Sequence, residues 1–577
     1  MTDRRGCTRR TLAAGLATLT AGLTAVSASE ATTWSPPFPV SGEERGGAPE
    51  LASSPARQDA VFVWQRGFDV LARRMAANGT LGVTHRLGWA VEEEDGTGPR
   101  ATLDRAGDAV VVWHGGDDTL RARRLGAKGE LGPSRVLARG LPASRFSPQA
   151  DVAVDAAGNV TVAWARVATE DIFPKGVRVV GGTVHARRFR ANGTLGSPID
   201  LPDGGRSVAP GVVVAPSGRA TIAWAQMAGD GEGSNVLAAT VDARGIVGSA
   251  RDVSGGLTWA GVSSGPQIAL DGAGNVTFAW LGGPGLSVVA RRMAADGALG
   301  PVHQLATGGS LDSVRVVSAL SGRSTIVWRS LGATAVSIAA RQLAPDGAPG
   351  PLLDLSGPAP TPVAEADVTD DARGRVTATW TQESAYTTAE AKVRSVQARQ
   401  VDPDGELGPT ARLVSGTSGT LRYPGVAAGS NGVVTAAWAT LGRIGSTVSA
   451  ARFVPRCYRV HVRRAVAHVL KHRQPPHAAG VHLNLVFDRA AALQVGRLVM
   501  SYTAPSGRRR SEPLLLTRRI DRTTMNQHLL IGIPSELRAK LRIGQRVNVQ
   551  VPLRAKTYAT GCDFGRRIAI RTSAVVR

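Results

Sequence analysis

The chain has 577 residues, of which 43% are hydrophobic and 20% charged, and its formal net charge is +23. This composition excludes collagen-like and disordered chains, and the length suffices for two or more domains of ordinary size. Gly and Pro are abundant, at 69 and 33 residues, and the apolar clusters are rich in Val and Ala without a heptad repeat. Many short strands joined by tight turns account for this pattern, so we expect an all-β protein.

Residues 1–28 have the pattern of a cleaved signal peptide. Basic residues precede an apolar run of about 16 residues, which is shorter than the roughly 20 that a membrane-spanning helix needs, and small residues follow at Val26–Ala28. Thr8–Leu12 contains an Arg-Arg pair and resembles the twin-arginine export signal of bacteria. The general secretory route is the alternative. By either route we expect a secreted or cell-wall-associated mature chain without a transmembrane segment.

Two cysteines, Cys457 and Cys562, remain after the signal peptide is removed. They stand near the two ends of the C-terminal segment, residues 456–577, and in an oxidising compartment they predict one disulfide. Two thiols without a second pair nearby do not form a zinc site. The sequence contains no phosphate loop, haem motif or catalytic triad motif, so we expect neither a metal nor a cofactor.

Internal repetition is the strongest signal in the chain. The repeat is marked by eight tryptophans: Trp64, Trp113, Trp164, Trp224, Trp280, Trp328, Trp380 and Trp438. A similar sequence motif recurs around each of them. It is clearest in Pro266–Trp280, which is followed by Ser287–Met293 and a turn at Asp296-Gly297. Four short strands in a repeat of about 50 residues are the signature of a β-propeller. We therefore predict an eight-bladed β-propeller over residues 29–455.

The repeats are not complete at the C-terminal end of the ring. The last repeat stops after its third strand, Ser449–Phe453, while Phe38–Gly42 resembles the fourth strands of other repeats, such as Arg251–Gly255. We predict that the mature N-terminal segment supplies the missing strand and closes the ring, because closure removes an exposed sheet edge.

One hairpin per repeat has a recognisable form. Asp155–Asn159 and Asp271–Asn275 both read Asp-x-x-Gly-Asn, and this text resembles the hairpins of NHL-type propellers of secreted bacterial proteins. The resemblance covers one hairpin per blade and implies the fold, which by itself does not decide function. We interpret Asp155, Asp271 and Asp371 as turn residues. Calcium binding is the alternative, although calcium needs six or more oxygens and each hairpin supplies few.

The loops between the second and third strands, and between consecutive blades, differ in length and content. We call this side of the ring the variable rim, and the side with the repeated tight turns the turn rim. Acidic residues gather in the variable loops: Glu92, Glu93, Glu94, Asp95, Asp117, Asp118, Glu170, Asp171, Asp230 and Glu232. If the rim is catalytic, a general acid and base acting on a glycoside would come from six of these carboxylates: Asp117, Asp118, Glu170, Asp171, Asp230 and Glu232. A solvated acidic rim is the simpler interpretation, because no pair is distinguished by its spacing.

Aromatic and basic residues have comparable alternatives. We interpret the eight repeated tryptophans as the apolar contact between one blade and the next. Trp89 and Trp259 lie in connections between blades, where an indole can stack on a sugar or anchor a loop. An Ala-Arg-Arg motif also recurs, as at Arg291-Arg292. We interpret these arginines as pairing between blades rather than as binding anions.

The C-terminal segment, residues 456–577, holds 24 Lys and Arg against five Asp and Glu, so it carries most of the net charge. Alternating runs such as Val481–Phe487 and Arg546–Val551 predict antiparallel strands, and we expect a small Ig-like β-sandwich. Its charge, including Arg508, Arg509 and Arg510, favours anionic partners: cell-wall polymers, acidic polysaccharide or lipid head groups. Nucleic acid is not expected, because no aromatic residues are interleaved with the basic ones.

These observations predict an exported, monomeric, non-catalytic binding or scaffold protein. The variable rim would bind a glycan or a protein, and the basic domain would associate with anionic cell-surface polymers. One alternative is a glycoside hydrolase or polysaccharide lyase that uses rim carboxylates. The other is a purely structural surface protein, for which neither the carboxylates nor Trp89 and Trp259 matter.

Overall fold

The computed structural model describes most of the chain from residue 34 onward. The described segments are residues 34–42, 47–54, 59–91, 98–141, 150–172, 176–227, 233–256, 265–282, 286–308, 310–331, 336–357, 363–383, 394–416, 419–429, 432–442, 446–454, 462–470, 480–487, 491–495, 498–504, 506–519, 526–557 and 568–576. The predicted signal peptide, Trp259 and both Cys457 and Cys562 lie outside these segments. Within them, no helix has the length and apolar character to cross a membrane.

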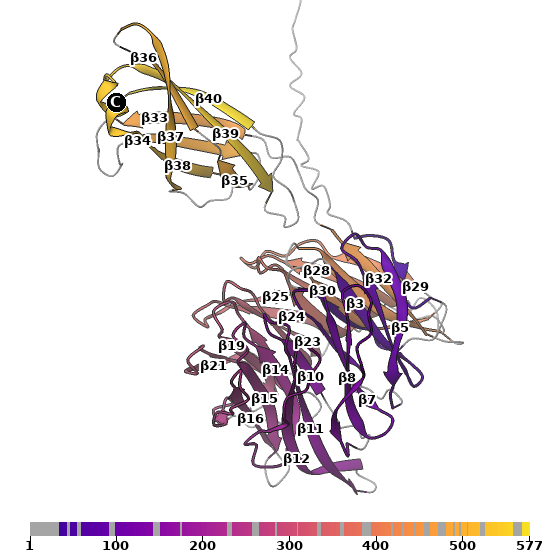
Figure 1. Cartoon of the computed structure of the whole chain (residues 1–577). Coiled ribbons are helices and arrows are strands. Elements are labelled where there is room, and N and C mark those ends of the chain that lie inside the picture. Colours follow the sequence, from indigo (N-terminus) through magenta and orange to yellow (C-terminus); the bar gives the residue numbers. More distant parts are fainter. Residues whose placement is uncertain are drawn as a thin grey trace, which may run out of the picture. The chain divides into compact units, whose positions relative to one another are not determined.

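The described chain is built almost entirely of antiparallel strands (Figure 1). Eight four-stranded sheets, here numbered sheet 1 to sheet 8, are followed by one eight-stranded sheet. The first four sheets contain β2 (Glu50–Ser53), β3 (Ala60–Arg66), β4 (Asp69–Met75) and β5 (Leu81–Trp89); β6 (Arg100–Leu103), β7 (Ala109–Gly115), β8 (Thr119–Leu125) and β9 (Arg135–Arg139); β10 (Ala150–Val154), β11 (Val160–Ile172), β12 (Gly176–Phe189) and β13 (Ile199–Asp200); β14 (Ser207–Val214), β15 (Ala220–Met227), β16 (Ser234–Val241) and β17 (Arg251–Asp252).

Sheets 5 to 8 repeat the same order. They contain β18 (Gln267–Leu270), β19 (Val276–Gly282), β20 (Ser287–Met293) and β21 (Leu299–Ala306); β22 (Ser310–Ser318), β23 (Ser324–Leu331), β24 (Val336–Leu343) and β25 (Pro349–Asp354); β26 (Val363–Asp370), β27 (Val376–Glu383), β28 (Arg394–Val401) and β29 (Ala411–Gly416); β30 (Thr420–Ala428), β31 (Val434–Leu441), β32 (Ser446–Phe453) and β1 (Phe38–Pro39). The last strand of sheet 8 therefore comes from the N-terminal side of the chain.

The pairing of β1 with β32 is the one that the incomplete last repeat predicted. Phe38 lies opposite Ala450 and Pro39 opposite Ser449, and the Val40 N–H donates to the Val448 carbonyl at 2.8 Å. The first strands contact one another in order from β2 to β30, and β30 contacts β2 in turn. These contacts form a closed cycle, so the arrangement is propeller-like and the two ends of the repeat array meet.

The second strand of each sheet is buried on both faces, which explains why its sequence is a continuous apolar run. Every residue of β19 is buried, whereas the outer strand β25 alternates between exposed and half-buried positions. The repeated tryptophans are all 0–3% exposed. Trp224 packs with Ala163 and Val184 of the preceding sheet, and Trp64 packs with Ala437 and Val448 of sheet 8. They are therefore the apolar contact between neighbouring sheets, as interpreted from the sequence.

The described C-terminal part is one eight-stranded antiparallel sheet. Its elements are β33 (Val462–Leu470), β34 (Gly480–Phe487), β35 (Ala491–Val495), β36 (Leu498–Thr503), β37 (Arg509–Arg519), β38 (Asn526–Gly532), α1 (Ser535–Lys540), β39 (Arg546–Thr557) and β40 (Ile568–Val575). The strand order is β33-β34-β38-β37-β36-β39-β35, with β40 paired to β39 off this path. Met500, Tyr502 and Val549 are buried, while Arg546, Asn548 and Gln550 of β39 are exposed. The predicted antiparallel strands are present; the Ig-like sandwich stays a prediction.

Candidate functional site

The acidic residues of the turn rim are turn residues in the structure. The Asp271 Oδ1 atom accepts the N–H groups of Ala273 and Asn275, both at 2.9 Å. Its Oδ2 atom accepts the Asn275 side-chain amide at 2.8 Å and pairs with Arg292. Asp155 makes the same contacts with its own hairpin. Both carboxylate oxygens are thus engaged by protein donors, which supports the turn interpretation over calcium binding.

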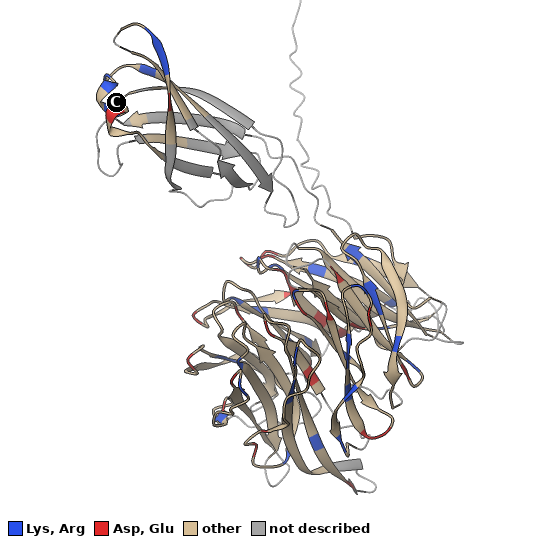
Figure 2. Ribbon diagram, in the orientation of Figure 1, with Lys and Arg blue, Asp and Glu red and all other residues tan. Residues whose placement is uncertain are grey.

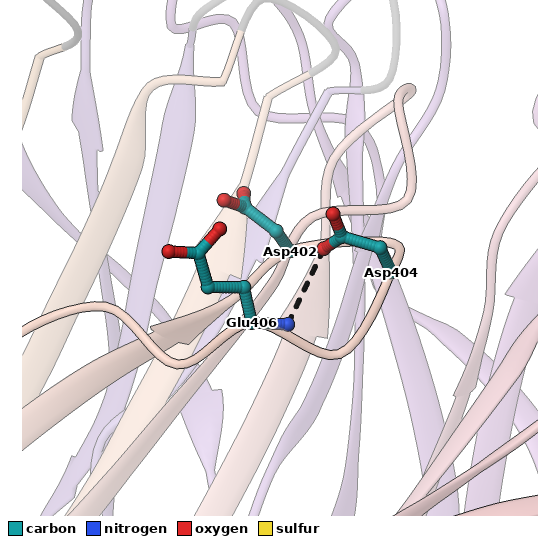
Figure 3. Close-up of side chains that lie close together, drawn as sticks. All are labelled: Asp402, Asp404 and Glu406. Carbon is teal, nitrogen blue, oxygen red and sulfur yellow. Dashed lines mark hydrogen bonds between the residues drawn. The ribbon is translucent and has the colours of Figure 1, made fainter.

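Three further carboxylates, Asp402, Asp404 and Glu406, lie close together on a turn of sheet 7 (Figure 3). Asp404 Oδ1 accepts the Glu406 N–H at 3.3 Å, and Asp402 Oδ1 accepts Arg375 Nε at 2.7 Å. Asp296 caps the equivalent turn of sheet 5 in the same way. The cluster therefore follows from turn chemistry and an arginine contact.

The recurring Ala-Arg-Arg text connects neighbouring sheets. The first arginine donates through Nε to a glycine carbonyl of its own sheet and through Nη1 to a carbonyl in or just after the last strand of the preceding sheet. In sheet 5, Arg291 contacts the Gly300 carbonyl at 2.8 Å and the Val253 carbonyl at 3.0 Å. In sheet 1, Arg73 contacts the Val40 carbonyl at 2.7 Å. The N-terminal segment is thus held by the same contact as an ordinary fourth strand.

A layer of eight residues, five of them charged, lies on the innermost strands. Each member stands opposite the residue that precedes a repeated tryptophan in the second strand. The eight residues of this inner layer are Glu50, Arg100, Asp151, Gly211, Gln267, Arg315, Asp367 and Gly425. The sequence analysis missed this layer, although its members stand at a nearly constant distance before the tryptophans.

The charged members of the inner layer connect one sheet to the next. Arg100 lies 3.3 Å from the Glu50 carboxylate. Asp151 accepts the Val212 N–H and Asp367 accepts the Val426 N–H, both at 2.8 Å. Burial raises the pKa of Glu50, Asp151 and Asp367 above their ordinary values. These carboxylates accept hydrogen bonds from backbone N–H groups of the neighbouring inner strands. The layer therefore joins adjacent sheets at the innermost part of the ring.

The variable-rim carboxylates predicted as catalytic candidates have separate environments. Asp117 accepts Arg121 Nη2 and Thr119 Oγ1, each at 2.5 Å, and these hydrogen bonds lower its pKa to about 2. Asp118 has φ 54° and is a turn residue. Glu170 is exposed on β11, which also contains Asp171. Glu92, Glu93, Glu94, Asp95, Asp230 and Glu232 lie outside the described residues.

An aromatic pair stands out on the variable rim of sheets 1 and 2. Phe68 and Trp89 are each 49% exposed, with ring centroids 5.6 Å apart and planes tilted by 47°. The Ala90 N–H donates to the Phe68 carbonyl at 2.7 Å, and Trp113 Nε1 donates to the Trp89 carbonyl at 3.1 Å. We call Phe68 and Trp89 the aromatic platform. Trp89 was predicted from the sequence as a binding residue, whereas Phe68 was not.

Backbone and charged neighbours position the platform. A Cβ atom on Gly116 would lie 1.9 Å from the Trp89 ring, so only glycine leaves room for the indole there. Trp89 pairs with Asp69 across β4 and β5, and the Asp69 carboxylate accepts Arg86 Nε at 2.5 Å. The platform therefore combines open apolar ring faces with charged hydrogen-bonding groups beside them.

Comparisons with known proteins give likenesses among solved structures. The sequence matches no protein-family model, and no curated protein is similar to it. A protein of unknown function from Dyadobacter fermentans DSM 18053 is 11% identical, with a TM-score of 0.37, over 73% of this chain and 98% of that one. An ulvan lyase of family PL25, bound to -[GlcA(1-4)Rha3S]-, is 10% identical, with a TM-score of 0.37, over 71% and 97%. The fucose-specific lectin of Aleuria aurantia is 14% identical, with a TM-score of 0.31, over 55% and 99%. None of these likenesses identifies a ligand or an activity for this chain.

Proposed function

We propose that the chain is an exported, non-catalytic binding protein whose variable rim recognises a glycan. The observation that carries this proposal is the aromatic platform, because Phe68 and Trp89 keep about half of their surface open to solvent. Ring faces of this kind match the apolar face of a sugar, and the indole is held by neighbouring strands rather than by a free loop. The Asp69–Arg86 pair beside them offers hydrogen-bond partners for sugar hydroxyls.

The state of Asp117 argues against its use as the general acid of a glycosidase. A glycosidase acid must hold a proton near neutral pH, so its pKa has to be raised. The guanidinium of Arg121 instead lowers the pKa of Asp117 to about 2. This carboxylate stays ionised and paired, which suits a structural role in its hairpin.

We infer that the eight sheets are the blades of one closed propeller, completed by the N-terminal strand, and that residues 456–577 form a separate basic domain. The cyclic contacts of the first strands and the pairing of β1 with β32 support the ring. Arg508, Arg509 and Arg510 are exposed and support association of the basic domain with an anionic cell surface. The signal-like residues 1–28 support export.

A retention experiment tests the glycan site. The mature chain is passed over immobilised neutral and acidic polysaccharides at about 0.5 M NaCl, where the Debye length is only a few ångströms and electrostatic association is suppressed. We expect retention on at least one neutral glycan, with affinity reduced about tenfold or more in Trp89→Ala. Leu320→Ala is the matched control, since Leu320 is 65% exposed elsewhere on the ring. Equal retention of wild type and Trp89→Ala would place the site elsewhere, and a failure to retain any glycan would favour a protein ligand or a structural role.

A further inference from the structure

The C-terminal domain has a group of basic side chains at one end. Arg508, Arg509 and Arg510 lie at the hairpin between β36 and β37, and Lys540, Arg542 and Arg546 lie at and after the end of α1. All six are exposed, and none is paired with an acidic residue in the described part of the domain. Figure 2 marks several of these positions in blue. We call these six residues and Ile543 the basic tip.

Hydrogen bonds hold the two segments of the basic tip together. Gln545 Nε2 donates to the Thr503 carbonyl at 2.7 Å, and the Arg542 N–H donates to Gln545 Oε1 at 2.9 Å. Thr503 pairs directly with Arg509 across β36 and β37. The turn at residues 542–545 is therefore fixed against the hairpin that carries Arg508, Arg509 and Arg510.

An apolar residue stands at the apex of this turn. Ile543 is 70% exposed, and the following Gly544 has φ +83°, which allows the tight turn that presents it. A single exposed apolar residue is ordinary on a protein surface. Ile543 is distinguished by its position on a turn that hydrogen bonds hold in place, beside six cations without an acidic partner among the described residues. A hydrophilic anionic polymer has no apolar layer to receive this side chain.

We propose that the basic tip binds the surface of an anionic phospholipid bilayer, which narrows the anionic surface of the proposed function to a lipid one. The guanidinium and ammonium groups would contact phosphate oxygens, and each basic residue near such a surface adds electrostatic attraction. Ile543 would enter the boundary between head groups and acyl chains, where a buried apolar group adds attraction that salt does not screen. Acidic polysaccharide is the competing partner, and it would use the arginines alone.

Vesicle co-sedimentation of the mature full-length chain tests this inference. The probes are vesicles of phosphatidylcholine alone and vesicles containing phosphatidylglycerol, with soluble heparin as the polymer. We expect at least a tenfold preference for the anionic vesicles. The triple variant Arg508→Gln, Arg509→Gln, Arg510→Gln should lose about tenfold or more in affinity. Ile543→Ser should lose about threefold or more for vesicles and nothing for heparin.

Matched controls lie on the ring. Val83→Ser removes a side chain that is also 70% exposed, and Arg105→Gln, Arg135→Gln, Arg244→Gln removes the same charge from exposed ring positions. Both should bind vesicles like wild type, and the melting temperature checks folding of each variant. Unchanged vesicle affinity of Ile543→Ser, or equal binding to both vesicle types, overturns the lipid proposal. Binding to heparin without binding to anionic vesicles also overturns it but leaves the anionic-surface part of the proposed function standing.

Discussion

At the scale of single residues, similar side chains take different roles because their surroundings differ. Asp117 on an exposed hairpin has its pKa lowered to about 2 by Arg121 and Thr119. Asp370, at the end of the inner strand β26, has its pKa raised to about 7 by burial and by the neighbouring Asp371. The two residues are of the same type, so residue type does not explain the difference between their pKa values. The difference comes from the hydrogen-bond partners of Asp117 and from the burial of Asp370.

Asp370 makes stability depend on pH. Its pKa rises from 3.8 in the unfolded chain to about 7 in the fold, so the folded state keeps the proton and the favourable contribution is complete below pH 4. That contribution is lost as the pH rises through 7. We expect Asp370→Asn to stabilise the chain at pH 8 by about 1–3 kcal/mol, after allowance for partial exposure of the side chain, and to change little at pH 4.

Melting temperatures at the two pH values check this expectation. Asp296→Asn is the control, because Asp296 is an exposed turn residue and the asparagine at the equivalent position 192 makes the same turn contact. A variant Asp370→Asn that destabilises equally at both pH values would show that Asp370 is ionised in the fold.

Gly116 tests the position of the platform. Alanine at this position would place its Cβ 1.9 Å from the Trp89 ring, so the indole has to move. We expect Gly116→Ala to lower glycan affinity about as much as Trp89→Ala, roughly tenfold, and to change the near-ultraviolet circular dichroism of the aromatic groups. Gly416→Ala is the control, since nothing lies within 4 Å of its added Cβ. Unchanged glycan binding by Gly116→Ala would show that the position of Trp89 does not matter for glycan binding.

At the scale of elements, arginines and carboxylates join one sheet to the next. Arg73 donates to the Gly82 carbonyl and to the Val40 carbonyl, both at 2.7 Å, and so ties β4 to its own fourth strand and to the N-terminal segment. Arg291 makes the equivalent contacts between sheets 4 and 5. The residues of the repeated Ala-Arg-Arg motif therefore form a strand and also make the contacts between neighbouring sheets.

Arg73 therefore controls how firmly the N-terminal segment is held. We expect Arg73→Ala to destabilise the chain by about 1–3 kcal/mol, because charge-assisted hydrogen bonds to backbone carbonyls are lost. It should also speed proteolytic removal of residues 34–42. Arg291→Ala should destabilise similarly without speeding that cleavage, as followed by mass spectrometry of the N-terminus. Equal cleavage rates in both variants would contradict a specific role for Arg73 in holding β1.

At the scale of the whole molecule, the repeat and its incomplete end were predictable because they follow from periodic residues. The eight buried tryptophans were expected from their spacing, and the β1–β32 pairing from the incomplete last repeat and the likeness of Phe38–Gly42 to other fourth strands. Phe68 was not predictable, because it stands in a turn that does not recur and its exposure depends on the packing of Trp89 over Gly116. The inner layer was within reach of the sequence, since its residues precede the tryptophans at a regular distance, but the charge varies from sheet to sheet.

Ring closure predicts a global effect of a small deletion. Removing residues 29–42 takes away β1 and the Val40 carbonyl that Arg73 contacts, and it leaves β32 as an open sheet edge. We expect a lower melting temperature and greater aggregation than for the intact mature chain, measured by scanning calorimetry and light scattering. An unchanged melting temperature would mean that β1 adds nothing to the ring.

The central claim is that the aromatic platform, rather than the basic domain, provides specific glycan recognition. Calorimetric titration of a retained neutral oligosaccharide at about 0.5 M NaCl into three forms of the mature chain tests it most directly: wild type, Phe68→Ala with Trp89→Ala, and Arg508→Gln with Arg509→Gln and Arg510→Gln. We predict that the platform variant loses detectable binding while the arginine variant binds like wild type. Binding by the platform variant at wild-type affinity would contradict the account.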